Sequence, residues 1–452
     1  MPTSQEPNSD QSMNRAQLRI DARWVLTMDA QNRVLRHHSL VIGQGRIIAC
    51  LPWDDAESAY PDAAVENRRS GILMPGLINA HTHLAMNLLR GYADDKPLKI
   101  WLEQHIWPTE AAHMGPEFVR DGTRLALAES ILAGVTTVND MYFFPDATAQ
   151  VCKEVGMRAT VGLLVLDFPT AWAKSTDEYF SRALALYDSL KDELLINTSF
   201  APHAPYTVSK GPLEKIATLS SELDLPVHMH VHETAQEIAD FEALHGVRPL
   251  QRLDEIGLLN PSLLAVHLTQ LNEHEIGRLA ESGAHAIHCP ESNLKLASGI
   301  CPVVDLIEAG VNVGVGTDGA ASNNDLDLLG ELRTAAFIGK VQSHDAAAIP
   351  ALRALRMVTI DAAFALGIDN ETGSLEPGKA ADCILIEPDL GMLPIYDAAA
   401  QVVFTNSSHC VQDVWVAGKR LLENRQLQTL DATELIQNAE RWGRRIMQNS
   451  SS

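Results

Sequence analysis

The sequence predicts an α/β protein: a (β/α)8 barrel of the TIM type with a small β-sandwich domain built from both termini. Candidate strands and helices alternate through the middle of the chain, whereas both ends hold short β-type runs. This alternation is typical of a parallel sheet covered by helices, and eight strand–helix units usually need about 250 residues. With 452 residues, 46% apolar and 21% charged, the chain has the length and the globular composition for both parts.

At the N-terminal end, residues 1–15 are polar and lack the basic flank and apolar run of a secretory signal, so we expect a disordered tail. Residues 16–71 are predicted to form the first part of the β-sandwich. They hold short β-type runs, separated in one place by a Gly-Gln-Gly turn, at 18–26, 39–42 and 46–50.

The C-terminal end shows the same pattern of short β-type runs and turns. Residues 372–428 are therefore predicted to form the second part of the β-sandwich. A turn-like stretch at 373–378 precedes β-type runs at 382–386 and 411–417. Helical spacing of the apolar residues at 433–447 predicts a closing helix within the last segment, 429–452.

Between these ends, residues 72–371 are predicted to form the barrel. Helical stretches such as 115–133 and 212–223 separate eight candidate strands, at 77–80, 136–140, 159–163, 196–201, 227–230, 264–267, 284–288 and 311–316. The interval from 84 to 135 is too long for one crossover helix, so we expect an insertion near the active face of the barrel.

Charge and cysteine content exclude several classes of partner. The chain has 35 Lys+Arg and 58 Asp+Glu, a net charge of −23, which disfavours binding to nucleic acid or to an anionic membrane surface. No apolar run of about 18 residues predicts a membrane-spanning helix. The six cysteines are scattered without a CxxC pair, which favours reduced thiols and a cytoplasmic location.

Histidines stand where two predicted strands end. In the stretch PGLINAHTH, residues 75–83, His81 and His83 alternate and therefore share one face of the strand. At the carboxyl end of a barrel strand that face looks into the active mouth, and imidazoles suit a borderline-soft divalent metal. Taken alone, the pair is explained equally well as two polar residues in a turn.

The stretch PVHMHVHE, residues 226–233, repeats the pattern with His228, His230 and His232 before Glu233. Spacing does not decide which of the three binds a metal, and a hydrogen-bonded histidine cluster is the alternative. A carboxylate just beyond them is placed to act as a proton shuttle to an activated water.

Three further apolar runs end in His267, His288 and Asp318. Each of these residues alone is more often a satisfied polar group than a ligand. Together, however, five predicted strands end in His or Asp, and all strands of a parallel barrel point the same way. The sequence therefore predicts that these side chains converge on one mouth.

These motifs — HTH at 81–83, the strand-end histidines His230 and His267, and Asp318 in GTDG — resemble the amidohydrolase superfamily over essentially the whole chain. Members with two metals carry a bridging lysine near the end of the fourth strand, and 196–206 has none. The resemblance therefore implies a metal-dependent hydrolase with one divalent ion, expected to be zinc. By similarity to the one-metal deaminases, its ligands are His81, His83, His230 and Asp318.

The same resemblance gives catalytic roles to Glu233, as proton shuttle, and to His267 and Asp318, which orient the attacking hydroxide. His228 and His232 are left as structural neighbours, and His285 is expected at the surface. His288 is expected to hydrogen-bond the attacked carbon's substituents.

Within the superfamily the chain is most similar to the 5′-methylthioadenosine/S-adenosylhomocysteine deaminases. The matching stretches are WLE at 101–103, WPTE at 107–110, APHAPY at 201–206, HVHET at 230–234 and SNLKLASG at 292–299. This likeness implies that Glu110 holds the ribose hydroxyls and that His203, Glu233, His288 and Asp318 contact the nucleoside. The implied reaction converts the 6-amino group of an adenine nucleoside to the inosine analogue and releases ammonia.

One stretch departs from that pattern. Members that act on S-adenosylhomocysteine hold its carboxylate with arginines after the third strand, but residues 166–174, LDFPTAWAK, contain one lysine and no arginine. This favours 5′-methylthioadenosine, with Phe168 and Trp172 predicted to cover its methylthio group; adenosine and S-adenosylhomocysteine stay open.

Two rival functions remain. Triazine chlorohydrolases and aminohydrolases resemble this chain too, and a metal site alone does not separate them from nucleoside deaminases. A catalytically inactive binding protein on the same scaffold is the remote alternative, although such relatives usually lose metal ligands. Guanine deamination fits less well, because the motif after the fourth strand differs. A homo-oligomer is expected, because it is common for this scaffold.

Overall fold

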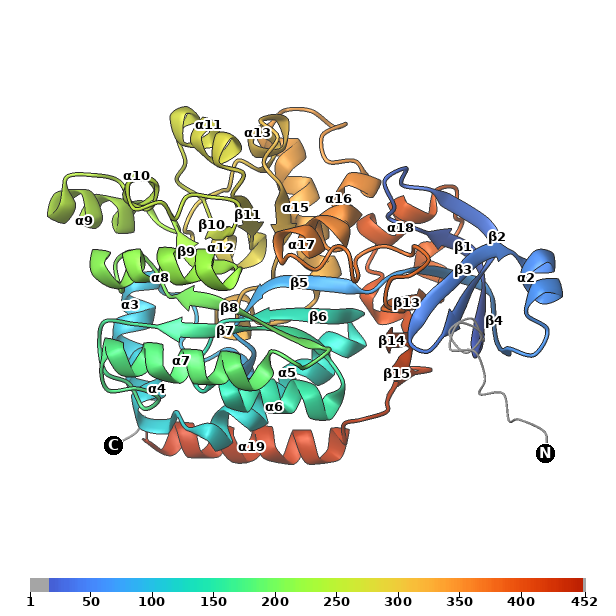
Figure 1. Ribbon diagram of the computed structural model, residues 1–452, viewed down its shortest axis with the longest axis horizontal. Helices are drawn as coiled ribbons and strands as arrows, with labels where there is room; N and C mark the ends of the chain where they lie inside the picture. Colours follow the sequence, from blue (N-terminus) through green and yellow to red (C-terminus); the bar gives the residue numbers. More distant parts are fainter. Residues whose placement is uncertain (1–15, 450–452) are drawn as a thin grey trace, which may run out of the picture.

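The computed structural model describes residues 16–449 and contains two eight-stranded sheets (Figure 1). Strands β5 to β12 follow one another in sequence order as a parallel sheet, and a parallel bridge between Thr82 and Asp318 joins its two edge strands. The second sheet has the order β16-β15-β14-β13-β4-β1-β2-β3 and so combines both ends of the chain. The predicted barrel with a β domain from both termini is confirmed.

The barrel strands are short and almost wholly buried. They are β5 (Leu77–Thr82), β6 (Val135–Asp140), β7 (Arg158–Val165), β8 (Ile196–Pro202), β9 (Val227–Val231), β10 (Leu263–His267), β11 (His285–His288) and β12 (Val313–Val315). Within them only Asn197 is exposed. Such strands are buried on both faces, by side chains inside the barrel and by helices outside it.

The helices that surround the barrel occupy the intervals between the strands. In chain order they are α5 (Pro116–Leu132), α6 (Pro145–Val155), α7 (Thr176–Leu190), α8 (Lys210–Leu223), α9 (Ala235–His245), α10 (Pro249–Glu255), α11 (Glu273–Ser282), α12 (Pro290–Lys295), α13 (Val303–Glu308), α14 (Ala320–Asn323), α15 (Leu328–Gln342), α16 (Ala351–Met357) and α17 (Ile360–Ala365). None of the helices in residues 16–449 has the length and apolar character needed to cross a bilayer.

The terminal sheet lies at one end of the barrel, on the right in Figure 1. Its strands are β1 (Leu18–Leu26), β2 (Val34–Gly43), β3 (Arg46–Pro52), β4 (Ala64–Pro75), β13 (Cys383–Ile386), β14 (Val411–Val416), β15 (Lys419–Glu423) and β16 (Gln426–Leu427). Strand β4 pairs in parallel with β1 and antiparallel with β13, so the two chain ends meet there. Only Gly76 separates β4 from β5, and the predicted domain limits at 71 and 371 stay predictions.

Three further helices complete the fold. Helix α2 (Trp53–Ala59) follows β3, and α18 (Ala398–Phe404) lies between β13 and β14. The closing helix α19 (Ala432–Asn449) packs against α5, where the rings of Trp442 and Phe118 are 5.2 Å apart. The tail predicted at 1–15 lies outside the described residues.

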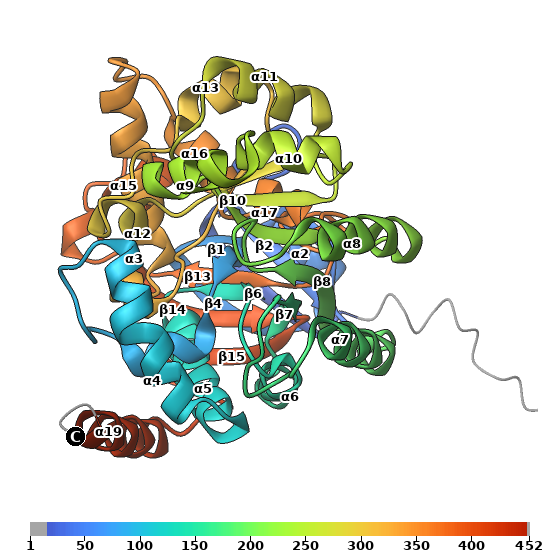
Figure 2. The ribbon, with the colours of Figure 1, turned by 90° about the vertical axis from the view of Figure 1, so that its left-hand side faces the viewer.

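The long interval after β5 holds an insertion of helical turns before the crossover helix α5. It contains η1 (Leu84–Leu89), α3 (Leu98–Trp101), the π-helical turn η2 (Leu102–Ile106) and α4 (Trp107–His113). Figure 2 shows α3 beside α12, and both α3 and α4 lie on the side of the molecule away from the terminal sheet. The insertion thus stands over the carboxyl ends of the barrel strands, as the length of the interval predicts.

Candidate metal centre and substrate cavity

Four predicted ligands come together at the barrel mouth. Ligand atoms of His81, His83, His230 and Asp318, from the ends of β5, β9 and β12, all lie within 4.8 Å of one another. Asp318 Oδ1 is 3.3 Å from His81 Nε2 and 3.2 Å from His83 Nε2, and the Nε2 atoms of His83 and His230 are 3.3 Å apart. The structure therefore contains a candidate metal site of three imidazoles and one carboxylate.

Each of the three imidazoles also makes a contact through Nδ1, its other ring nitrogen. His83 Nδ1–H donates to the Met141 carbonyl at 2.5 Å, and His230 Nδ1–H donates to the His203 carbonyl at 2.7 Å. A carbonyl oxygen only accepts, so Nδ1 carries a proton in both rings and Nε2 is the nitrogen that faces the cluster. His81 Nδ1 contacts His228 Nε2 at 2.7 Å, which makes His228 a supporting neighbour of the cluster.

The chemistry of these residues fits a divalent cation. His81 Nε2 is fully buried and makes no hydrogen bond, although it faces the other ligand atoms. Burial acts to raise the pKa of Asp318, but contacts with His81 and His83 hold it well below its ordinary value, so the carboxylate is ionised. Burial lowers the pKa of His81 to about 4, which keeps that ring neutral. Burial disfavours the charged form of His83 too, yet Asp318 raises its pKa to about 9, so a metal competes with a proton there.

The backbone is bent sharply where the site residues leave their strands. His267 and Asp318 have φ of +78° and +61°, values that side-chain-bearing residues rarely adopt and that gather at functional sites. Gly316 lets β12 approach β5, because a Cβ at this position would lie 2.5 Å from the backbone nitrogen of His81. These conformations place Asp318 over the histidines of β5.

Beside the cluster stand Glu233 and His267. Burial, with the charge of Asp318, raises the pKa of Glu233 to about 8, so this carboxyl group is protonated at neutral pH. His267 Nε2 lies 3.8 Å from Glu233 Oε2, and its ring stacks on that of His230 with centroids 5.4 Å apart. His267 is not one of the four mutually close ligands.

Helix α12 supplies two positioning residues that the sequence analysis did not single out. Ser292 Oγ donates to Asp318 Oδ2 at 2.7 Å, and Asn293 Oδ1 accepts from His267 Nδ1–H at 2.9 Å. Adjacent residues of one short helix thus orient both Asp318 and His267. The available signal was a Ser-Asn pair directly after the seventh strand, inside the stretch 292–299.

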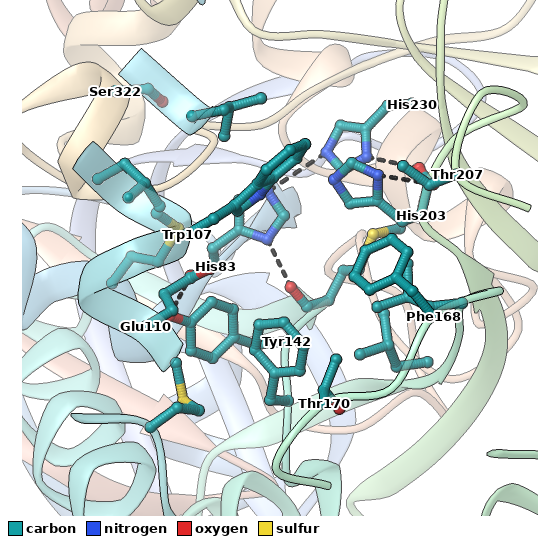
Figure 3. A pocket seen from close by; sticks show the side chains of 18 of the residues that line it. His83, Trp107, Glu110, Tyr142, Phe168, Thr170, His203, Thr207, His230 and Ser322 are labelled. Atoms are coloured by element: carbon teal, nitrogen blue, oxygen red, sulfur yellow. Dashed lines mark hydrogen bonds between the residues drawn. The ribbon is translucent and has the colours of Figure 1, made fainter. Parts of the chain in front are cut away.

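Three residues of the cluster, His83, His230 and Asp318, line the floor of a cavity of about 680 Å³. One wall comes from the insertion and another from the segment after β7, and both are largely apolar. Their lining residues include Trp101, Trp107, Met114, Leu166 and Phe168. Figure 3 shows Phe168 across the cavity from Trp107 and Glu110.

Glu110 and His203 are two further polar residues that line this cavity. Glu110, buried on α4, accepts a hydrogen bond from the Tyr142 hydroxyl at 2.6 Å, visible as a dashed line in Figure 3. Burial raises the pKa of Glu110 to about 7, although the Tyr142 bond opposes the shift. His203 Nδ1 contacts Thr207 Oγ1 at 3.0 Å, and burial lowers the His203 pKa to about 3.

The model of the amidohydrolase family matches residues 72–421. The chain belongs to the amidohydrolase family. It is 49% identical to the 5-methylthioadenosine/S-adenosylhomocysteine deaminase of Teredinibacter turnerae, with 94% of this chain and 97% of that protein covered.

Two solved structures extend the comparison. An adenosine deaminase from Xanthomonas campestris with bound zinc is 50% identical and superposes with a TM-score of 0.94, covering 96% of this chain and 99% of that chain. An atrazine chlorohydrolase from Arthrobacter aurescens complexed with zinc is 25% identical, with a TM-score of 0.88, 94% of this chain and 99% of that chain covered.

In this amidohydrolase, four of the five expected substrate contacts line the cavity: Glu110, His203, Glu233 and Asp318. The fifth, His288, does not line it; its ring is buried and neither nitrogen has a hydrogen-bond partner. A contact between His288 and substrate therefore stays a prediction.

Two expectations about neighbouring residues are wrong. Trp172 does not cover the cavity, because it is buried and packs against Tyr179 with ring centroids 5.5 Å apart. His285 is not a surface residue: it is 5% exposed, and its Nδ1 contacts the Asn312 amide at 3.1 Å. As the first residue of β11 it lies under Phe364 of α17, with ring centroids 5.3 Å apart.

Proposed function

We propose that this amidohydrolase is a hydrolytic deaminase of adenine nucleosides, with 5′-methylthioadenosine as preferred substrate and the inosine analogue and ammonia as products. One observation carries the proposal: a single cavity is lined by three of the four candidate metal ligands and by the carboxyl group of Glu233 at its floor, and by a second buried carboxyl group, Glu110, on its wall. The relative from Teredinibacter turnerae, named for this activity and 49% identical, supports it.

We propose one zinc ion as cofactor, held by His81, His83, His230 and Asp318. The zinc bound in the structure from Xanthomonas campestris supports this choice, as does the absence of lysine from β8 and from residues 203–206. Such an ion supplies a water molecule whose pKa is lowered toward about 7. Three imidazole nitrogens and one carboxylate oxygen are ligand types that would hold zinc.

Glu233 is the proposed proton donor. With a pKa of about 8 it carries a proton at neutral pH, and it can pass this proton to N1 of the purine. Water then adds at C6 and returns one proton to Glu233. Its second proton passes to the amino nitrogen, the bond from C6 to that nitrogen breaks, and ammonia leaves. Asn293 holds His267 with its Nε2 toward Glu233, where it can orient the attacking water. Asp318, fixed through Oδ2 by Ser292 and Ser322, orients the same water.

Glu110 is the proposed anchor for the ribose. A carboxylate that accepts from both hydroxyls of a vicinal diol is a strong, directional contact, and the Tyr142 bond leaves one carboxylate oxygen of Glu110 uncommitted. His203 is proposed to contact the nucleoside from β8. The 5′ substituent then meets apolar residues such as Leu166 and Phe168. Lys174 is the single lysine or arginine among the described lining residues. Its Nζ donates to the Thr170 carbonyl at 2.6 Å, which weakens it as a partner for the carboxylate of S-adenosylhomocysteine.

The substrate class is tested by ammonia release from 5′-methylthioadenosine, adenosine, S-adenosylhomocysteine and a chlorotriazine. We expect the highest kcat/KM for 5′-methylthioadenosine and the lowest for the ribose-free triazine. The likeness to an atrazine chlorohydrolase makes triazine hydrolysis the second candidate. A higher kcat/KM for the triazine would overturn the assignment of Glu110 and His203. No turnover of any substrate by protein with a confirmed metal content would favour the non-catalytic alternative.

We further propose that the enzyme acts in the cytoplasm as a homo-oligomer on small, uncharged nucleosides. The net charge of −23 disfavours capture of anionic nucleotides and association with nucleic acid or anionic membranes. Light scattering of the purified protein measures the oligomeric state directly.

A further inference from the structure

A second group of metal-binding side chains lies outside the cavity. Among residues 16–449, only two groups of three or more His, Cys, Asp or Glu residues bring their ligand atoms within 4.8 Å of one another. The first is the cluster at the barrel mouth; the second consists of Asp389, His409 and Cys410, none of which lines the cavity. This group lies between β13 and β14, on the terminal-sheet side of Figure 1.

The local backbone holds the three residues together. Asp389 caps the turn η3 (Leu390–Met392), where its Oδ1 accepts from Gly391 N at 2.8 Å, so Oδ2 is left for His409. His409 and Cys410 belong to the turn η4 (Ser408–Cys410). The Glu387 N–H donates to the Cys410 carbonyl at 2.9 Å and ties this turn to the end of β13. Two short turns from distant positions in sequence are thereby fixed against each other.

The side chains converge on one ring nitrogen. His409 Nε2 lies 2.9 Å from Asp389 Oδ2 and 3.5 Å from Cys410 Sγ. In a nucleophilic relay the two ring nitrogens serve different partners, the acid on one and the thiol on the other. Here both partners face the same nitrogen, which has only one proton or one lone pair to offer. The arrangement therefore does not fit a Cys-His-Asp nucleophile.

The distances do fit ligands around a shared cation. Zinc bonds of about 2.0–2.3 Å at tetrahedral angles put neighbouring ligand atoms roughly 3.3–3.8 Å apart. The separation of His409 Nε2 from Cys410 Sγ already has this value, and the half-exposed Asp389 side chain needs to retreat by only about half an ångström. Cys410 is buried beneath the two exposed side chains, which leaves the outer side open for a fourth ligand from water.

We propose that Asp389, His409 and Cys410 form a second metal site, specific for zinc-class divalent cations. A thiolate and an imidazole favour zinc or cobalt over magnesium or calcium, which prefer oxygen ligands. Binding releases the thiol proton, so it strengthens as the pH rises. Without a metal, His409 Nε2 and Asp389 Oδ2 form an exposed contact, which contributes little to stability.

Cobalt(II) titration of the full-length protein tests this proposal, because only the second site has a sulfur ligand. We expect a thiolate-to-cobalt charge-transfer absorption in the wild type and in Cys50→Ser, a control that removes a cysteine of β3. Cys410→Ser and His409→Gln should lose this absorption and, after dialysis against zinc, one equivalent of bound zinc. His409→Gln leaves the buried position intact, so it keeps the test decisive if Cys410→Ser unfolds.

Two results would overturn the second site: no charge-transfer absorption in the wild type, or an absorption that persists in Cys410→Ser. Neither readout depends on deaminase activity or on the sulfur-free cluster at the barrel mouth. The second site and the proposed function can therefore fail independently.

Discussion

The floor and the walls of the cavity are built on different principles. On the floor, each candidate ligand comes from a barrel strand end and is held by a second contact, as Ser292 holds Asp318. Asn293 holds the neighbouring His267 in the same way. The walls come from the helical insertion and the loop after β7, and most of their lining side chains are apolar. The floor is therefore suited to one fixed chemistry, whereas the walls determine which molecule reaches it.

Loss of the proton donor should have the largest effect. We expect Glu233→Gln to lower kcat by roughly 10³-fold, because general acid catalysis contributes about 10²–10⁴-fold. Glu233 is not among the four metal ligands, so metal content should stay unchanged. Steady-state kinetics with metal analysis check this; near-normal turnover in the variant would remove Glu233 from the mechanism.

Loss of the contact between Asn293 and His267 should lower kcat nearly as much. Asn293→Ala releases His267 Nδ1, and we expect kcat to fall about 10–100-fold, the usual cost of losing such a supporting contact, with little change in KM. Asn293→Asp should instead shift the pH profile to higher pH, because an ionised partner favours the protonated imidazole. Leu294→Ala, at the exposed neighbouring position, is the control and should match the wild type.

A wall residue should act on binding rather than on the chemical step. Glu110→Gln weakens the proposed ribose contact, so KM for nucleosides should rise about 10-fold or more, since hydrogen bonds to charged groups contribute about 1.5–3 kcal/mol. The exposed Glu103 provides the matched control, Glu103→Gln, with unchanged kinetics. A fall in kcat with KM unchanged would place Glu110 in the chemistry and blur the distinction between floor and walls.

The pH dependence should report the state of Glu233. Its carboxyl group must be protonated to act as the donor, and its pKa is raised to about 8 by burial and by Asp318. Activity should therefore be retained toward neutral pH and fall about tenfold per pH unit above pH 8, as the proton is lost. Profiles of kcat/KM between pH 6 and 10 test this; an alkaline limb that starts near pH 5 would contradict a protonated donor.

The smallest expected effect concerns substrate choice at the wall. Lys174→Arg introduces a bidentate partner for a carboxylate, so it should raise kcat/KM for S-adenosylhomocysteine roughly threefold to tenfold. The value for 5′-methylthioadenosine should stay within a factor of two or so, because this substrate has no carboxylate. An equal change for both substrates would show that Lys174 does not face the 5′ substituent.

A difference between residues at strand ends and residues placed by packing explains how much of the site could be predicted from the sequence. Strand periodicity predicts that the His and Asp side chains at the strand ends converge on one mouth, because the strands of a parallel barrel share one direction. The resemblance to the one-metal deaminases then selects His81, His83, His230 and Asp318 among them. The supporting contacts of Ser292 and Asn293 depend on how one turn of helix sits on the mouth, which no periodicity encodes.

The surroundings of Trp172, His285 and His288 have no signal in the sequence for a related reason. The burial of Trp172 and His285 depends on packing between distant segments: against Tyr179 of α7 in one case, against Asn312 and Phe364 in the other. The unsatisfied ring nitrogens of His288 likewise have no signature in the local sequence.

The most direct test of hydrolytic deamination is turnover of 5′-methylthioadenosine in water enriched with oxygen-18, followed by mass spectrometry of the nucleoside and assay of ammonia. The proposed chemistry predicts one solvent oxygen in the purine ring position formerly bearing the amino group, with one ammonia released per turnover. Release of free adenine, or a product without solvent oxygen on the purine, would contradict it.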